Sequence, residues 1–342
     1  MSEERIDEDN LQEEQSDLYE HHRIVVDRGQ SLLRIDKFLV TRIVNISRSK
    51  IQAAANANCV LVNSVPVKSS YKVKGEDVIS MLLPYPVREF ETMAEDIELE
   101  VIYEDDSVVV VNKRAGMVVH PSFGHYNGTL QNALLFHFQK QENNKEAFPY
   151  LVHRIDKDTS GLLLVAKNEY AQASISKQFY DRTVKRKYFA LVWGDVQKDE
   201  GTITGHIGRN LSNRKLMSVF PEGDYGKHAV SHYKVIERFR YVTLVECQLE
   251  TGRTHQIRAH FKYIGHTLFN DEFYGGNQIL KGVNYSKYKQ FVENCFRILP
   301  RQALHAYYLC FTHPVTKEKL SFEIPLPEDM QEAILKWRNY RN

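Results

Sequence analysis

The sequence contains few cysteines, and they are widely separated. Cys59, Cys247, Cys295 and Cys310 include no CxxC pair. This spacing argues against a disulfide framework and against a zinc cluster, and it suits a reducing compartment. We therefore expect four structural thiols and no metal site.

Long apolar runs and common cofactor motifs are also missing. No run of about 18 apolar residues occurs, which argues against a membrane-spanning helix. The N-terminus resembles neither a signal peptide nor a transit sequence. The chain has neither a P-loop nor a GxGxxG turn after a strand, so the usual nucleotide-binding folds are not indicated. These absences predict a cytoplasmic protein that does not contact a membrane.

The composition indicates a soluble globular protein, with 342 residues, 42% of them hydrophobic and 26% charged. The net charge of +1 hides an asymmetry. Residues 1–20 carry nine acidic side chains and one basic side chain, whereas residues 21–342 carry 44 basic and 35 acidic side chains, a surplus of +9. Such a surplus is compatible with a polyanionic partner, although it is spread over a long segment.

Changes in composition and in hydrophobic pattern divide the chain into four parts. Residues 1–22 are acidic and lack apolar periodicity, which predicts a disordered tail. Residues 23–83 form a compact unit, with helices expected over 32–44 and from an N-cap at Ser47, and strands at 59–63 and 78–81. Residues 84–97 contain prolines and read as a linker. Residues 98–342 form the larger domain.

The larger domain mixes strand and helix patterns. Strands are expected at 101–106, 108–111, 162–166, 184–192, 242–249, 304–311 and 320–324, and helices at 128–139, 170–181 and 328–337. His120 and His137 are too isolated for a metal site, and we interpret both as structural.

The stretch 151–167 concentrates polar groups between two apolar runs, as LVHRIDKDTSGLLLVAK. Asp156 is flanked by Arg154 and Lys157, and nearby cations favour the ionised form of a carboxyl group. An ionised and oriented aspartate is a nucleophile or a base. The alternative is that Asp156 and Asp158 only cap a turn, and this segment alone does not separate the two interpretations.

A second feature is the strand at 184–192. Alternate residues of a strand share a face, so Arg186 and Tyr188 point together while Lys185 and Lys187 point the other way. If the strand borders a cleft, Tyr188 can stack on a base; otherwise it is a core residue.

The motif HRIDKDTSGLLLVAK resembles the catalytic motif of the RluA-type pseudouridine synthases. Matches continue in family order at Asn112 and Lys113, at Lys187 and Tyr188, at 251–260 (TGRTHQIRAH) and at 301–306 (RQALHA), and together span about 98–328. The unit at 23–83 resembles the RNA-binding module first known from small-subunit ribosomal protein number four, here called the S-four module.

This resemblance implies an α+β fold. The catalytic domain would have a mixed, mainly antiparallel sheet with flanking helices and a central RNA cleft, beside the small N-terminal α/β module. It implies an RNA pseudouridine synthase without a cofactor or metal. The implied catalytic residues are Asp156, Tyr188 and Arg258, with Arg258 paired to Asp156. The implied RNA-binding residues are Arg34, Lys37, Arg48, Lys50, Arg154, Arg186, Arg253 and His255.

The favoured substrate is large-subunit ribosomal RNA, with transfer RNA second, and we expect a monomer. Two other classes remain open. A non-catalytic RNA-binding protein would need only the basic surfaces, and a glycosidic hydrolase would need a second acid near Asp156. The chain departs from the family at Thr267 and Asn270, where proline and glycine are common, and residues 277–300 resemble an insertion.

Overall fold

A computed structural model describes residues 19–43, 46, 48–83, 92–121, 125–142, 148–213 and 215–341. The chain divides into two compact units, residues 1–91 and 92–342. Most of the predicted tail and residues 84–91 of the predicted linker lie outside the described residues. Residues 92–97 pack with the larger unit, because Asn132 donates to the carbonyl oxygen of Met93 and accepts from the amide of Glu95 through its own carbonyl.

In its described residues, the smaller unit contains two short helices and two small sheets. Its elements are β1 (Tyr19–Val25), β2 (Leu33–Arg34), α1 (Ile35–Arg42), α2 (Arg48–Asn56), β3 (Val60–Val62), β4 (Val65–Pro66), β5 (Lys72–Val73) and β6 (Val78–Leu83). One sheet has the order β1-β6-β3-β4, and β2 pairs with β5. Residues 19–22 therefore belong to a strand and not to the predicted tail, because they pair with β6.

Two local predictions for this unit have clear outcomes. The helix predicted over 32–44 is shorter, because Leu33 and Arg34 pair with β5 instead. Asn58 adopts a left-handed φ of 58° in the turn after α2, a conformation that asparagine tolerates better than most residues. The N-cap predicted at Ser47 lies outside the described residues.

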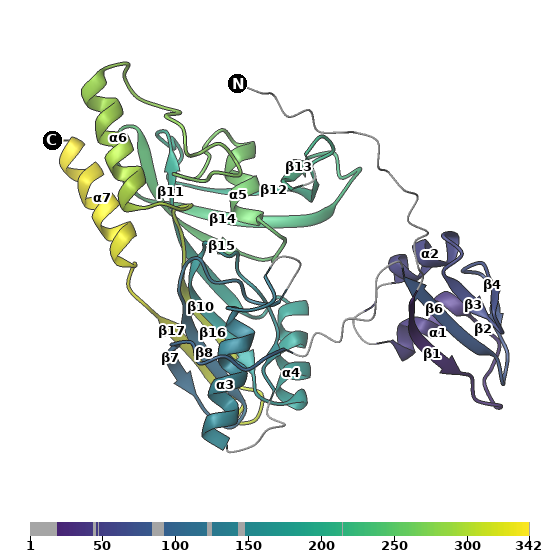
Figure 1. Cartoon of the computed structure of the whole chain (residues 1–342). Coiled ribbons are helices and arrows are strands. Elements are labelled where there is room, and N and C mark those ends of the chain that lie inside the picture. The colour runs from purple at the N-terminus through teal and green to yellow at the C-terminus, as the bar shows by residue number, and fades with distance from the viewer. Residues whose placement is uncertain are drawn as a thin grey trace, which may run out of the picture. The chain divides into compact units, whose positions relative to one another are not determined.

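The larger unit is built on one long sheet (Figure 1). Its order is β13 (Met217–Phe220), β12 (Glu200–Arg209), β14 (Lys227–Arg238), β15 (Val242–Leu249), β11 (Lys185–Trp193), β16 (Leu304–Thr312), β10 (Ser160–Ala166), β8 (Val108–Lys113) and β7 (Glu100–Glu104). β17 (Lys319–Glu323) pairs with β16, and β9 (Tyr150–Leu151) with β10. In the described part of this sheet only β10 and β16 run parallel, which confirms the predicted mixed, mainly antiparallel α+β fold.

Strands β8 and β10 are buried on both faces. Val109, Val111 and Leu163 pack into one core with α3 (Leu130–Glu142), whereas Val108, Val110 and Leu162 pack into another with α4 (Glu169–Tyr180). Because both faces are covered, the sequences of these strands are continuous apolar runs and do not alternate between apolar and polar residues.

A third core lies under α6 (Ser286–Ile298) and α7 (Glu328–Arg341), which lie side by side in Figure 1. Trp193 and Trp337 are both fully buried in it. The predicted insertion 277–300 contains α6, and Tyr288 of this helix is buried in the same core. The insertion is therefore an integral part of the larger unit.

Strands β10 and β16 approach each other closely at their parallel junction. Gly161 has a φ of +117°, and a Cβ atom there would overlap the carbonyl oxygen of Ala306. Only glycine fits this combination of left-handed backbone and close approach. The strand that follows the Asp156 loop is thus fixed against the end of the RQALHA motif, where β16 begins.

We expect Gly161→Ala to lower the free energy of unfolding by about 3 kcal/mol or more, because it adds a clash to an unfavourable φ. The matched control is Gly265→Ala, where φ is +83° but no atom lies within 4 Å of the added methyl group. That control should cost about 1 kcal/mol. Denaturant unfolding of both variants measures the difference, and equal losses would refute the proposed close approach.

None of the described helices is both long and apolar enough to cross a bilayer.

Candidate active site

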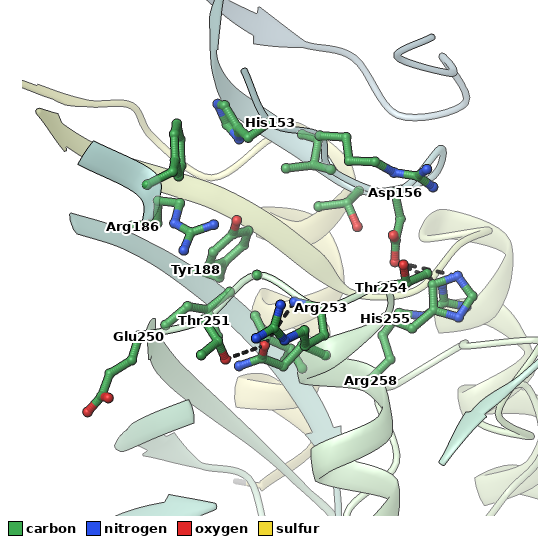
Figure 2. A pocket seen from close by; sticks show the side chains of 18 of the residues that line it. His153, Asp156, Arg186, Tyr188, Glu250, Thr251, Arg253, Thr254, His255 and Arg258 are labelled. Atoms are coloured by element: carbon green, nitrogen blue, oxygen red, sulfur yellow. Dashed lines mark hydrogen bonds and ion pairs between the residues drawn. The ribbon is translucent and has the colours of Figure 1, made fainter. Parts of the chain in front are cut away.

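The motifs singled out in the sequence meet around one cavity of about 710 Å³ (Figure 2). Its walls come from the loop before β10, the end of α4, the start of β11 and the segment from the end of β15 into α5 (Gln256–Tyr263). The lining residues include Arg154, Asp156, Arg186, Tyr188, Arg253, His255 and Arg258. All three predicted catalytic residues and four of the predicted RNA-binding residues therefore share one cavity.

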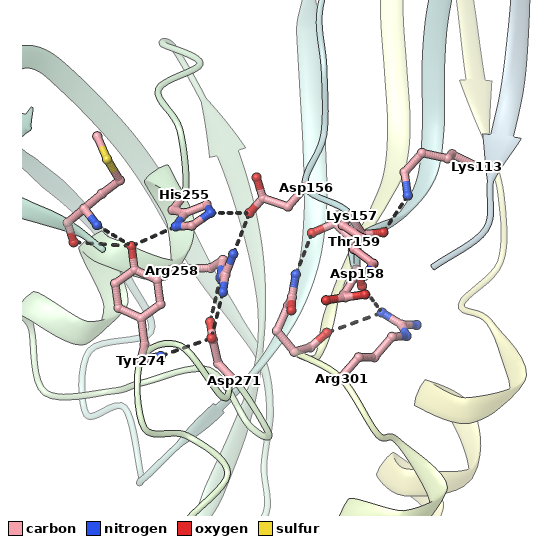
Figure 3. A network of polar contacts seen from close by, with 12 residues as sticks. Lys113, Asp156, Lys157, Asp158, Thr159, His255, Arg258, Asp271, Tyr274 and Arg301 are labelled. Atoms are coloured by element: carbon pink, nitrogen blue, oxygen red, sulfur yellow. Dashed lines mark hydrogen bonds and ion pairs between the residues drawn. The ribbon is translucent and has the colours of Figure 1, made fainter. Parts of the chain in front are cut away.

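Arg258 lies between two aspartates. Its Nη1 donates to Asp156 Oδ2 at 2.9 Å, while its Nε and Nη2 donate to the two oxygens of Asp271 at 2.7 and 2.8 Å (Figure 3). The side chains of Arg258 and Asp271 are 3% and 0% exposed, whereas that of Asp156 is 18% exposed. The bidentate contact with Asp271 fixes the guanidinium, which in turn orients the accessible carboxylate.

Asp271 was missed by the sequence analysis. It follows Asn270 in the segment GHTLFNDEFYGG, and nothing in the local pattern marks an ion-pair partner for a residue thirteen positions earlier. Both carboxylates contribute to a raised pKa of Arg258, Asp271 more strongly, and this outweighs the opposing effect of burial. The guanidinium is therefore permanently charged.

His255 forms the other wall beside Asp156. It occupies the N-cap position of α5 with a left-handed φ of 53°, a conformation that is uncommon for residues other than glycine but that histidine adopts more readily than most. Its Nε2 lies 4.0 Å from Asp156 Oδ2, and its Nδ1 lies 3.1 Å from the hydroxyl of Tyr274. Burial lowers the pKa of His255, so the ring is neutral at pH 7 and the contact with Asp156 is not a strong ion pair.

Tyr188 and Arg186 face the cavity together, as the strand alternation predicted. Tyr188 is only 6% exposed and packs in the main core, so it is both a core residue and a wall of the cavity. Burial raises the pKa of its hydroxyl, which stays protonated at neutral pH. An aromatic face and a neutral hydroxyl are thus available to a bound ring.

The loop that carries Asp156 is held from both sides by the buried basic side chains of Lys113 and Arg301 (Figure 3). Lys113 donates to the carbonyl oxygen of Lys157 at 2.9 Å, and burial lowers its pKa to about 7. Arg301 donates to the carbonyl oxygen of Asp158 at 3.1 Å and forms a bidentate pair with Asp329 of α7. The turn is therefore positioned by contacts from distant segments, in addition to any capping within it.

His153 stabilises the same region as a neutral side chain. Its Nε2 accepts from the amide of Leu164 at 2.9 Å, and its ring lies 4.8 Å from the ring of Phe179. Burial lowers its pKa to about 3, so it is neutral at physiological pH. His120 and His137 contact Gln131 and Glu104 respectively, and neither lines the cavity.

The predicted RNA-binding residues fall into two groups. Arg154 is exposed at the cavity, and Arg253 donates from Nε to the carbonyl oxygen of His228 at 3.1 Å. In the S-four module, Arg34 and Arg48 both bind the buried carboxylate of Asp36. Hydrogen bonding, first of all from Arg34, holds the pKa of Asp36 well below its usual range.

These two arginines thus have a structural partner that the sequence analysis did not anticipate. Their side chains nevertheless remain 41% and 48% exposed. Lys37 is exposed on α1, and the side chain of Lys50 lies outside the described residues. Their contact with RNA stays a prediction.

Two acids line the cavity, and only Asp156 is paired with a buried cation, Arg258. Glu250 is the other acid in its wall, and it pairs with His232 at 2.7 Å and Arg182 at 3.6 Å. Asp158 does not line the cavity. Within the described part of the chain no three metal-binding side chains cluster. The arrangement therefore favours a single carboxylate over the paired acids of a glycosidic hydrolase.

We expect Asp271→Asn to lower the free energy of unfolding by about 3 kcal/mol, because it leaves a buried guanidinium with one anionic partner. Asp199→Asn is the matched control, since Asp199 pairs with Arg238 at 2.6 Å but is 87% exposed. That control should change stability by less than about 1 kcal/mol. Urea unfolding measures the free energy of unfolding of both variants. Similar losses in the two would contradict the special position of Asp271.

Comparisons with known proteins show the family of this chain. A family model described as RNA pseudouridylate synthase matches residues 107–263, and one described as the S4 domain matches residues 33–79. A relative named uncharacterized RNA pseudouridine synthase from Chlorobaculum parvum is 45% identical, over 92% of this chain and 96% of its own length. The ribosomal large subunit pseudouridine synthase D of Nitrosomonas europaea is 41% identical, over 90% and 85%.

Solved structures agree as well. Human RNA pseudouridylate synthase domain containing 1 superposes with a TM-score of 0.51 and 27% identity, over 70% of this chain and 89% of its own. The family matches and the near full-length relatives cover both units of the chain. This chain belongs to the RluA-type family of RNA pseudouridine synthases and carries an N-terminal S-four module.

Proposed function

We propose that this enzyme converts uridine to pseudouridine in structured RNA, with large-subunit ribosomal RNA as its substrate and Asp156 as its essential carboxylate. The observation that carries the proposal is the ion pair between Asp156 and Arg258 at the wall of a cavity of about 710 Å³. A pocket of this size is in the range that holds a small ligand.

The reaction breaks the bond between nitrogen 1 of uracil and the sugar, turns the base and joins carbon 5 to the same sugar carbon. No atom is gained or lost, and no oxidant or energy source is required. Asp156 supplies a carboxylate that attacks the sugar or the base during cleavage. Arg258 holds that carboxylate in one orientation because it is itself fixed by Asp271.

Other side chains of the cavity interact with the detached uracil ring. Tyr188 offers an aromatic face on which uracil can stack, worth roughly 1–3 kcal/mol per base. Its hydroxyl lies in the same cavity as Asp156 and relays the proton of carbon 5: it accepts that proton while giving up its own, and nitrogen 1 of the product gains one proton in exchange.

Entry of the target requires base flipping. A uridine stacked in a helix cannot reach a side chain in a recessed cavity, and extrusion costs a few kcal/mol. Arg154 is exposed beside Asp156 and fills the gap that the extruded base leaves. Loops and weak pairs are therefore preferred targets.

Two observations support a ribosomal substrate. Relatives of nearly the same length are named ribosomal large subunit pseudouridine synthase D, and the N-terminal match is to a module of the S-four type. Basic residues of that module position RNA through phosphate contacts without reading its sequence. Transfer RNA is the second candidate.

Asp156→Asn should abolish turnover while the affinity for RNA falls by less than about tenfold, or 1.4 kcal/mol, because the change removes a charge but little contact area. Asp158→Asn is the control, and it should keep most of the activity because Asp158 does not line the cavity. Pseudouridine formation and RNA binding are measured on the same preparations. Retained turnover in Asp156→Asn would reject its assignment.

Mapping pseudouridines in total RNA from cells with and without the protein tests the substrate. We expect one or more sites in large-subunit ribosomal RNA to be lost, and to return with the wild-type gene but not with Asp156→Asn. Loss of sites only in transfer RNA would transfer the assignment to the second candidate. Unchanged maps in all RNA classes would leave only the RNA-binding alternative.

A further inference from the structure

Arg186 is a buried cation in the cavity wall. It lies on β11, is 9% exposed and places its guanidinium 5.1 Å from the ring of Phe179. Figure 2 shows this guanidinium beside the ring of Tyr188, on the opposite side of that ring from Asp156. The cavity thus has a carboxylate end and a cationic end, with Tyr188 between them.

The charge of Arg186 has no anionic partner among the described residues. Its Nε is buried without a hydrogen bond, and no carboxylate forms an ion pair with it. Glu250, the acid in the nearby wall, pairs instead with Arg182 and His232. Burying an unpaired charge is costly, and proteins normally avoid it unless a ligand completes the pair.

Gly252 makes room for this side chain. A Cβ atom at position 252 would lie 2.8 Å from Nη1 of Arg186, closer than normal packing allows. Gly252 is not among the glycines with positive φ, so the backbone conformation does not require glycine there. The motif TGRTHQIRAH therefore contains a glycine whose effect is to admit the Arg186 guanidinium into the cavity wall.

We propose that Arg186 binds a backbone phosphate of the RNA strand next to the uridine in the cavity. A guanidinium offers a planar fork of donors that matches a phosphate, and the contact would supply the missing anion. The proposal rests on the proposed function, because the uridine stacked on Tyr188 brings its own phosphodiester to the cationic end. Arg186 then fixes the sugar relative to Asp156.

The same contact separates a polynucleotide from smaller ligands. A free uracil or uridine has no phosphate to offer, so it leaves Arg186 unpaired and the cavity incompletely filled. A uridine within a strand satisfies both ends at once. The site therefore selects a nucleotide held in a chain, independently of the base sequence around it.

Arg186→Met tests whether the charge serves a ligand or the fold. The methionine fills similar space without charge, so the melting temperature should be unchanged or higher if Arg186 is unpaired in the free protein. Affinity for RNA should fall about 10-fold to 100-fold, the effect of losing hydrogen bonds to a charged group. A lowered melting temperature with unchanged RNA affinity would show a structural role and overturn the proposal.

Binding is measured with a stem-loop RNA that carries a uridine located by the mapping experiment, in proteins that also contain Asp156→Asn to prevent turnover. The slope of log affinity against log salt should become shallower by about 0.7–0.9 in Arg186→Met, as expected for one lost phosphate contact. Arg182→Gln is the control, because Arg182 is half exposed and already faces Glu250. Equal changes in both variants would indicate general attraction and would refute a specific site.

Single methylphosphonate substitutions identify the phosphate. At one position beside the target uridine, neutralising the phosphate should weaken binding to the protein that retains Arg186 but not to the protein with Arg186→Met. If every neutral position weakens both proteins equally, the proposal is wrong. Failure of the proposed function is seen separately, as retained turnover in Asp156→Asn or as an unchanged pseudouridine map.

Discussion

The guanidinium of Arg258 is the constraint on which the site depends. It is almost fully buried and is shared by two aspartates with different tasks. Asp271 holds it through two hydrogen bonds and is sealed from solvent, whereas Asp156 meets it through one and stays partly exposed. An arginine held by one carboxylate can orient another without relying on flexible solvent-exposed contacts. This division keeps Asp156 both fixed in position and open to the cavity.

The sheet explains why these groups meet. Asp156 precedes β10, Tyr188 lies on β11, and Arg258 belongs to the helix that follows β15, the neighbour of β11. The parallel contact of β10 with β16 brings the RQALHA segment beside the Asp156 loop, where Arg301 reaches its main chain. Because α7 supplies Asp329 to Arg301, even the C-terminal helix contributes to the position of the loop.

The sequence predicted those features of the site that follow from strand alternation and from the family motifs. Alternation along β11 placed Arg186 and Tyr188 on one face, and the motif resemblance paired Asp156 with Arg258. The sequence could not predict the contacts of Asp271 and Arg301, because their partners depend on how distant loops meet in three dimensions. The same limit applies to the contact of Asp36 on α1 with Arg48 at the start of α2, which adds to the local contact of Asp36 with Arg34. The resemblance to the S-four module marked these arginines as RNA-binding residues, but only packing reveals that they also share a buried carboxylate.

Asn270 shows how the departures from the family pattern are connected. Its φ of 54° suits glycine, yet its side-chain amide donates to the carbonyl oxygens of Phe296 and Leu299 at the end of α6. Glycine could adopt this backbone but could not close that helix end. The asparagine, which directly precedes Asp271, and the additional helix therefore form a matched pair, and a chimera with the helix but without the asparagine would lose the side-chain donor to the carbonyl groups of Phe296 and Leu299.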